Sequence, residues 1–362
     1  MMKTPARVSH AEPRNRGEDE DAESCSPRPR ASARESDAIP SCDRQALRPL
    51  LDRLCLEFDP RHISPDPIEI VHEYADPGDQ EVAALLAAAL AYGNVRHILR
   101  SVRSALAALG PHPREAARKL TEREAIELLR DFRHRFNSGM DVARLVLAIG
   151  WALREHGSLE SLFLEGYSPG DPHVGPALDA FASRLAATRL PAVDRRETRL
   201  GLVSLARFLL PRPSDGSACK RLNLFLRWMV RGPDGVDLGL WRRVSRAQLV
   251  MPLDTHVWRI CRQLGLTRRS SPDWRAALEI TAVFREFAPQ DPVRYDFAIS
   301  RLGILRRCGP RESTSRCGEC VLREVCVRET GAPPGSSRGA AAHRTRKGCG
   351  GAVSRTRKVR GS

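Results

Sequence analysis

The sequence has no apolar run long enough to cross a membrane. Its longest such stretch, from Val82 to Tyr92, falls well short of the ~18 residues that a membrane-spanning helix requires. The N-terminus is rich in charge and has no apolar segment followed by small residues, so it does not resemble a secretory leader. We therefore expect a cytoplasmic protein that does not contact a membrane and whose ten cysteines remain reduced.

Alternation of Val, Ile and Thr at every second position, which marks β-strands, is nearly absent from the chain. Between residues 44 and 307, apolar side chains recur at helical spacing instead, which predicts an all-α domain. Residues 1–43 and 329–362 contain few large apolar side chains and cannot bury enough surface to order themselves. We interpret these segments as disordered tails, the second of them basic.

Capping residues predict where several helices begin. Asn94 and Gly110 bracket one helix, and Thr121 with Glu124 has the spacing of a capping box for another. The remaining predicted helix starts are Asp79, Ser217, Asp254, Asp273 and Asp291.

Acidic residues are outnumbered, with 44 Asp and Glu against 59 Lys and Arg, which gives a net charge of +15. Eight of the basic residues lie in the acid-free segment 331–362, so the rest of the chain carries +7. A basic protein favours phosphate backbones, and duplex DNA is the partner that we expect. A genome that prefers arginine to lysine would explain the same excess. No obligate protein partner is predicted.

Four cysteines gather in a short segment near the C-terminus, Cys308-x8-Cys317-x2-Cys320-x5-Cys326. Four thiolates converging from one turn-rich loop are the ligands that a [4Fe-4S] cluster needs, so we predict an iron–sulfur loop over residues 308–328. A structural zinc site is the alternative. It is less favoured because zinc ribbons usually have two C-x2-C pairs and this segment has one.

A second candidate site is the turn around Gly216 and the helix expected after it, in which Lys220 falls in the first turn. The positive end of the helix dipole and partial burial would both lower the pKa of this amine, and a neutral amine is a nucleophile. Asn223, Arg227 and Arg231 share its helix face and are candidates for nucleic-acid contacts. The alternative is that this face is a solvated flank without a function.

A third candidate is the segment Pro252-Leu-Asp-Thr-His-Val-Trp-Arg259. Asp254 stands where an N-cap is expected, and a carboxylate there can be a structural cap or a catalytic group. Taken alone, the structural interpretation is favoured. Its place after a lysine-bearing helix favours the catalytic one.

In this order, the Lys220 helix, the Asp254 motif and the cysteine loop resemble the helix-hairpin-helix DNA glycosylases, the endonuclease III-like superfamily. Strings such as GSACKRLNLFLRWMVR and DPVRYDFAISRLGIL also resemble a bacterial family of unknown function placed near that superfamily, over about residues 45–328. The resemblance implies a two-lobed helical fold that ends in the cluster loop. Arg231 to Trp241 looks like an inserted loop relative to the superfamily.

The resemblance also implies an activity. Lys220 would match the lysine that forms a Schiff base, and Asp254 the carboxylate that stabilises a positively charged sugar. The chain would then be a nucleoid-associated DNA N-glycosylase, with AP-lyase activity possible, acting on damaged or mispaired bases in base excision repair. Tyr92, Asn94 and His256 would lie at the DNA, where Tyr92 could fill the gap left by a flipped nucleotide or be an ordinary core aromatic.

Two other functions are compatible with the same residues. The first is a non-enzymatic DNA- or RNA-binding iron–sulfur protein that kept the scaffold without the chemistry. The second is an iron–sulfur redox protein independent of nucleic acid, which would show no salt-dependent DNA binding.

Overall fold

A computed structural model describes residues 43–188, 208–305, 307–309 and 316–326 of the chain. The predicted basic tail 329–362, and all of the predicted N-terminal tail except Asp43, lie outside these residues.

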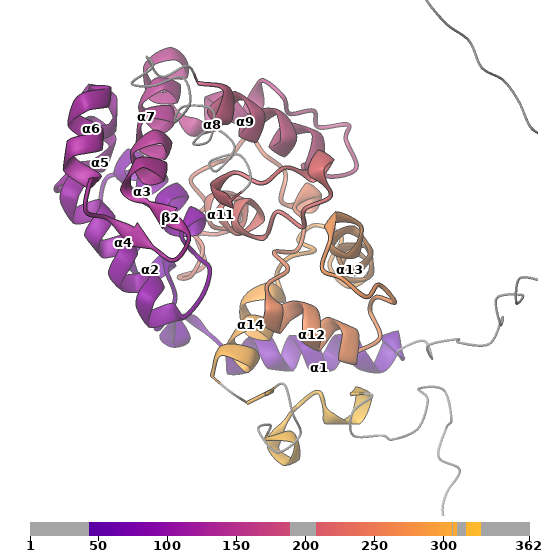
Figure 1. Cartoon of the computed structure of the whole chain (residues 1–362). Coiled ribbons are helices and arrows are strands. Elements are labelled where there is room, and N and C mark those ends of the chain that lie inside the picture. Colours follow the sequence, from indigo (N-terminus) through magenta and orange to yellow (C-terminus); the bar gives the residue numbers. More distant parts are fainter. Residues whose placement is uncertain (1–42, 189–207, 306, 310–315, 327–362) are drawn as a thin grey trace, which may run out of the picture. The chain divides into compact units, whose positions relative to one another are not determined.

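The described residues form thirteen α-helices and one two-stranded sheet, which confirms the all-α prediction (Figure 1). The α-helices are α1 Arg44–Glu57, α2 Ile68–Val71, α3 Pro77–Ala89, α4 Val95–Leu109, α5 Pro113–Lys119, α6 Glu122–Leu129, α7 Gly139–His156, α8 Leu159–Leu164, α9 Gly175–Ala187, α11 Lys220–Val230, α12 Thr255–Gln263, α13 Trp274–Phe287 and α14 Asp296–Ile304. The short 3-10 helices are η1 Pro60–His62, η3 Pro213–Asp215, η4 Arg246–Gln248, η6 Cys317–Glu319 and η7 Arg323–Val325. The strands β1 Arg133–His134 and β2 Asn137–Ser138 pair antiparallel.

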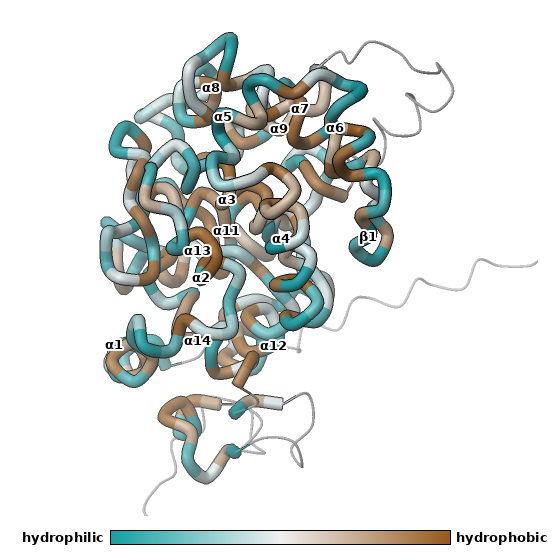
Figure 2. Tube along the Cα trace, turned by 90° about the vertical axis from the view of Figure 1, so that its left-hand side faces the viewer, coloured by the Kyte–Doolittle hydropathy of each residue, from teal (hydrophilic) through white to brown (hydrophobic). Residues whose placement is uncertain are grey.

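Helix α3 is the centre of the core. Residues 82–91 are all buried, because the helix is apolar on every side and is surrounded by α2, α5 and α11. In Figure 2 the apolar stretches run through the middle of the fold around α3 and α11. The end of α3 is therefore held rigidly, and it leads directly into the candidate site.

The N-terminal helix α1 joins the C-terminal part of the chain. It packs against α14, which in turn packs against α12, so these three helices lie together in Figure 1. The ion pair between Arg44 and Glu286 links the start of α1 to α13 as well. The cysteine segment follows α14 and is attached to it by a hydrogen bond from Cys308 N to Leu302 O of 2.9 Å.

Most of the predicted caps are present. Asn94 and Gly110 cap the two ends of α4, and Thr121 and Glu124 form the complete capping box of α6. Asp254 and Asp273 are the N-caps of α12 and α13.

Three predicted helix starts are wrong. Helix α3 begins earlier than Asp79, because Asp76 accepts the capping hydrogen bond and Pro77 suits the first helical position. Helix α11 begins at Lys220 and not after Ser217, since Cys219 has a left-handed φ of 48° and interrupts the helix there. Helix α14 begins at Asp296, because the Asp291 carboxylate accepts from Arg231 instead of capping a helix.

Candidate functional site

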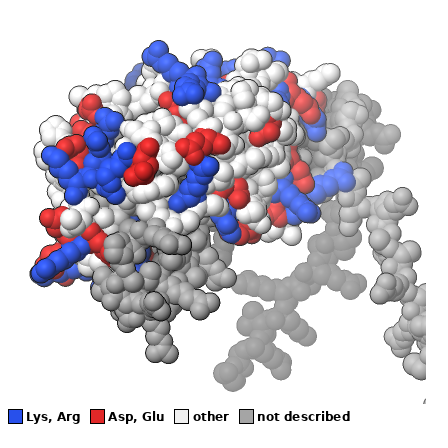
Figure 3. All heavy atoms as spheres, turned by 90° about the horizontal axis from the view of Figure 1, so that it is seen from above, with Lys and Arg blue, Asp and Glu red and all other residues white. Residues whose placement is uncertain are grey.

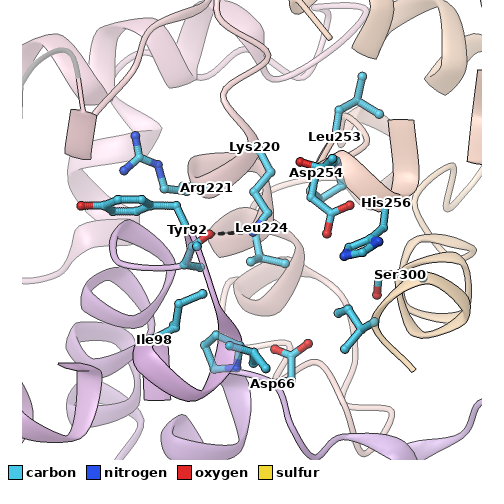
Figure 4. A pocket seen from close by; sticks show the side chains of 18 of the residues that line it. Asp66, Tyr92, Ile98, Lys220, Arg221, Leu224, Leu253, Asp254, His256 and Ser300 are labelled. Carbon is cyan, nitrogen blue, oxygen red and sulfur yellow. Dashed lines mark hydrogen bonds between the residues drawn. The ribbon is translucent and has the colours of Figure 1, made fainter. Parts of the chain in front are cut away.

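A pocket of about 850 Å³ opens where the first turns of α11 and α12 approach the end of α3 (Figure 4). One wall comes from the loop before α2 and from the loop between α3 and α4. The opposite wall comes from α12 and α14. The polar residues that line it are Asp66, Tyr92, Asn94, Lys220, Arg221, Arg227, Asp254, Thr255, His256, Asp296, Ser300 and Arg301.

Lys220 is the first residue of α11 and extends into this pocket, where its Nζ donates a 3.0 Å hydrogen bond to Ala91 O. Burial lowers the pKa of Lys220, and nearby carboxylates act in the opposite direction, Asp254 most strongly. The predicted place of Lys220 in the first helical turn is thus confirmed. Because its pKa is lowered, the Lys220 amine is neutral more often than the amine of an exposed lysine.

Asp254 lies across the pocket from Lys220 in Figure 4. Its Oδ1 accepts a 2.7 Å hydrogen bond from Val257 N, so the carboxylate caps α12 and lines the pocket at once. The structural and the catalytic interpretations of Asp254 therefore do not exclude each other. One oxygen suffices for the cap.

His256 projects into the pocket between Asp254 and Ser300. Its Cβ and ring pack on Gly303 of α14, where an added Cβ would lie 2.4 Å from His256 Cβ. Burial is the main cause that lowers the pKa of His256, and the cations Arg259, Lys220 and Arg301 lower it further, while Asp254 raises it. The imidazole is thus held towards its neutral form.

Tyr92 and Asn94 both line the pocket, and both are held by hydrogen bonds. The Tyr92 hydroxyl lies 3.0 Å from His134 O and also bonds to Asn137, while the Arg221 guanidinium lies 5.1 Å from its ring centre. Asn94 is exposed and caps α4 by accepting from Arg96 N.

The helix face that the sequence assigns to nucleic-acid contact is mostly interior, so this expectation needs correction. Asn223 is buried and donates to Ala218 O, and Arg227 is 2% exposed and pairs with Asp237 and Asp296. Arg231 pairs with Asp237 and, at 2.9 Å, with Asp291.

The acids that neutralise these arginines come from elsewhere in the sequence. Asp237 belongs to the loop from Arg231 to Trp241, and Asp291 and Asp296 precede and begin α14. Ion pairing, rather than solvent, is what allows this face of α11 to carry charge. Asn223 lies in the interior and away from the pocket, whereas Arg227 contributes to the pocket lining.

Two aromatic residues at the pocket were not anticipated from the sequence. Phe136 is 71% exposed at the tip of the β1–β2 hairpin, and its ring centre lies 6.2 Å from that of Phe208. The hairpin contacts the loop after α3 at two points. Gly93 leaves room for the Arg135 side chain, and the Tyr92 hydroxyl is hydrogen-bonded to Asn137. A large apolar residue between Arg135 and Asn137, in an otherwise polar turn, was the signal available in the sequence.

The four cysteines of the C-terminal segment are all partly exposed. Arg316 N donates a 2.9 Å hydrogen bond to Arg307 O. This bond joins the residue directly before Cys317 to the residue directly before Cys308. Burial raises the pKa of Cys320, and the nearby Cys308 and Cys326 raise it further. Cys308 and Cys326 are thus both near enough to Cys320 to affect its thiol.

No group of three or more His, Cys, Asp or Glu side chains is already arranged to hold a metal ion in the part of the chain that the structure describes. Cysteine thiols are the donor type that a thiolate-bound metal centre takes. The described helices also include none long and apolar enough to cross a membrane.

Fold and pocket together define a mostly helical protein with a partly buried lysine and a capping aspartate in one polar pocket. The chain belongs to DUF2400, a protein family of unknown function, whose family model matches residues 66–305. The match includes nearly the whole pocket and ends before Cys308. No curated protein and no solved structure matches the chain.

Proposed function

We propose that this protein is a DNA N-glycosylase of the helix-hairpin-helix type, which removes damaged or mispaired bases in base excision repair and can cleave the abasic strand. The observation that carries the proposal is the meeting of Lys220 and Asp254 in one pocket. They come from different helices, burial lowers the pKa of Lys220, and Asp254 is the carboxylate with the largest electrostatic effect on it.

The two side chains suit the two demands of this reaction. Breaking an N-glycosidic bond builds positive charge on the sugar, and the Asp254 carboxylate stabilises that charge. The Lys220 amine attacks the sugar carbon C1′ and forms an imine, from which strand cleavage by β-elimination follows. The hydrogen bond from Lys220 to Ala91 O keeps the amine in place before the substrate arrives.

Access to C1′ in a duplex requires the nucleotide to be turned out of the stack. Phe136 and Phe208 stand at the pocket and offer aromatic faces on which bases can stack. Phe136 takes the gap-filling role that the sequence suggested for Tyr92, because Tyr92 is fixed by its hydrogen bonds whereas Phe136 is exposed.

The phosphate backbone would follow α4. Arg96 and Arg100 are exposed on this helix, one turn apart, and neither is paired with an acid among the residues with described positions. Asn94, at the start of the same helix, lines the pocket. The face seen in Figure 3 is less suitable, since acidic and basic side chains are interspersed over it.

We further propose that Cys308, Cys317, Cys320 and Cys326 hold a [4Fe-4S] cluster, with structural zinc as the alternative. Such a centre would cross-link the segment after α14 and stabilise it. The carbonyl of Cys308 already accepts from Arg259 of α12, so the segment is connected to the helix that Asp254 caps.

A direct test of the function uses the purified full chain and a panel of duplexes, each carrying one damaged or mispaired base. We expect release of at least one of these bases, and slower release by the Lys220→Ala variant. A protein that binds the duplexes but releases no base would support the non-enzymatic nucleic-acid-binding function and contradict the glycosylase.

A further inference from the structure

Asp296 is a buried acid at the pocket that the chemistry above does not use. It is the first residue of α14, is 2% exposed and contributes to the pocket lining. Its Oδ2 is bound by Arg227, but its Oδ1 has no hydrogen-bond partner among the described residues. Leaving a buried carboxylate oxygen unpaired is costly, so this atom points to a missing polar partner.

Ser300 lies one turn further along α14 and also lines the pocket. Its hydroxyl donates to Phe297 O at 2.8 Å, so its lone pairs remain available as acceptors. An acid and a hydroxyl oxygen on one helix face can engage the polar edge of a base that enters the pocket.

The surroundings of Asp296 make it a weaker acid than an exposed aspartate. Burial raises the pKa of Asp296 to about 6, Arg227 lowers it, and Asp254 and Asp237 raise it. The titratable or charged groups of the surrounding elements that interact with this carboxyl are Lys220, Arg227, Asp237, Asp254, Cys261 and Arg301.

We propose that Asp296 is a catalytic residue that donates a proton to the departing base. This inference rests on the proposed glycosylase function. As the C1′–N bond breaks, its electron pair stays with the base, a ring nitrogen of the base takes the proton from Asp296, and the base leaves neutral. Lys220 forms the new bond to C1′, and the proton that its amine loses restores the Asp296 acid.

The experiment compares two reactions of the same protein across pH 5 to 8. One is single-turnover release of a base from a duplex of the panel that wild type was found to process. The other is borohydride trapping on a preformed abasic strand, in which no base leaves. The ratio of base release to trapping should fall as the pH rises through about 6, because the acid form of Asp296 is lost above that pH.

The Asp296→Asn variant should release the base on the order of 10²-fold more slowly and lose this pH dependence. Its trapping on abasic DNA should stay within a few-fold of wild type. Retention of the wild-type rate and pH profile by Asp296→Asn would overturn the proposal. Should this variant fail to fold, a wild-type ratio that does not fall above pH 6 overturns it equally.

Asp237→Asn is the matched control. Asp237 also neutralises Arg227, at 3.1 Å, but it does not line the pocket. If Asp296 acts only as a counter-ion for Arg227, the two variants will show the same loss, and the proposal is overturned. If wild type neither releases a base nor forms a trapped adduct, the glycosylase function itself is contradicted. Failure of that function is thereby distinguished from failure of the role proposed for Asp296.

Discussion

Asp254 is the carboxylate that acts most strongly on the Lys220 amine, although it also caps α12 through a 2.7 Å hydrogen bond from Val257 N. The capping bond uses Oδ1 and fixes the carboxylate without occupying it fully. A negative charge held in place before the reaction costs no reorganisation when the sugar becomes positive. The cap is therefore part of the proposed chemistry and not an alternative to it.

This double role predicts the behaviour of Asp254→Asn. The amide oxygen can still accept from Val257 N, so the free energy of unfolding should change by less than about 1 kcal/mol. Base release should slow by on the order of 10²-fold or more because the negative charge is gone, while DNA affinity stays near wild type. Asp76→Asn, which alters the N-cap of α3 outside the pocket, is the matched control and should leave the rate unchanged. Equal rates for Asp254→Asn and wild type would mean that Asp254 is only a cap.

The exposed position of Phe136 predicts a loss of binding without a loss of stability. Phe136→Ala should weaken DNA binding by about 1–3 kcal/mol, the usual contribution of one base stacked on an aromatic ring. Fluorescence anisotropy with a labelled duplex measures the affinity, and thermal unfolding measures the stability. Leu56→Ala removes another exposed apolar side chain, on α1, and should change neither. If the two variants bind alike, Phe136 does not contact the bases.

Arg96 and Arg100 are expected to contact phosphates. Replacing both by alanine should weaken binding to all sequences alike and lower the slope of log affinity against log salt by roughly 2, since each lost phosphate contact removes nearly one unit. The control replaces Arg130, which is paired with Glu127 at 2.7 Å, and should leave the slope unchanged. An unaltered slope for the Arg96 and Arg100 variant would place the DNA on another face.

The cysteine segment predicts a metal content. Protein purified without oxygen should contain about four irons per chain and absorb broadly in the visible range. Cys320→Ala should remove the metal and loosen the segment after α14, whereas Cys55→Ala, at a free thiol of α1, should do neither. Colourless protein with one zinc per chain would favour the structural zinc site instead.

The parts of the site that lie in linear motifs could be predicted from the sequence. Lys220 and Asp254 each follow a local signal, a turn before a helix and an N-cap, and such signals depend on neighbours in the chain. The helix starts at Asp79, Ser217 and Asp291 could not be predicted reliably, because a competing cap, a left-handed residue or a distant arginine decided them.

The remainder of the site depends on contacts between distant segments. Arg227 can lie in the interior because Asp237 and Asp296, from two other segments, form ion pairs with it. The spacing of residues along α11 does not predict these two partners. Asp296 resembles an ordinary charged residue in the sequence, and only its burial at the pocket gives it an unusual environment. The exposure of Phe136 likewise depends on how the hairpin rests on Gly93.

Borohydride trapping on an abasic DNA strand tests the central claim most directly. Lys220 and Lys119 are the two lysines in the described part of the chain, and Lys119 pairs with Glu115 of the same helix, outside the pocket. We predict a covalent protein–DNA adduct with wild type and with Lys119→Ala, and none with Lys220→Ala. Because burial lowers the pKa of Lys220, its neutral amine forms at a lower pH than that of an exposed lysine. The yield of adduct should therefore reach its plateau at a correspondingly lower pH. An adduct that persists in Lys220→Ala, or no adduct with wild type at any pH, would contradict the assignment of Lys220 as the nucleophile.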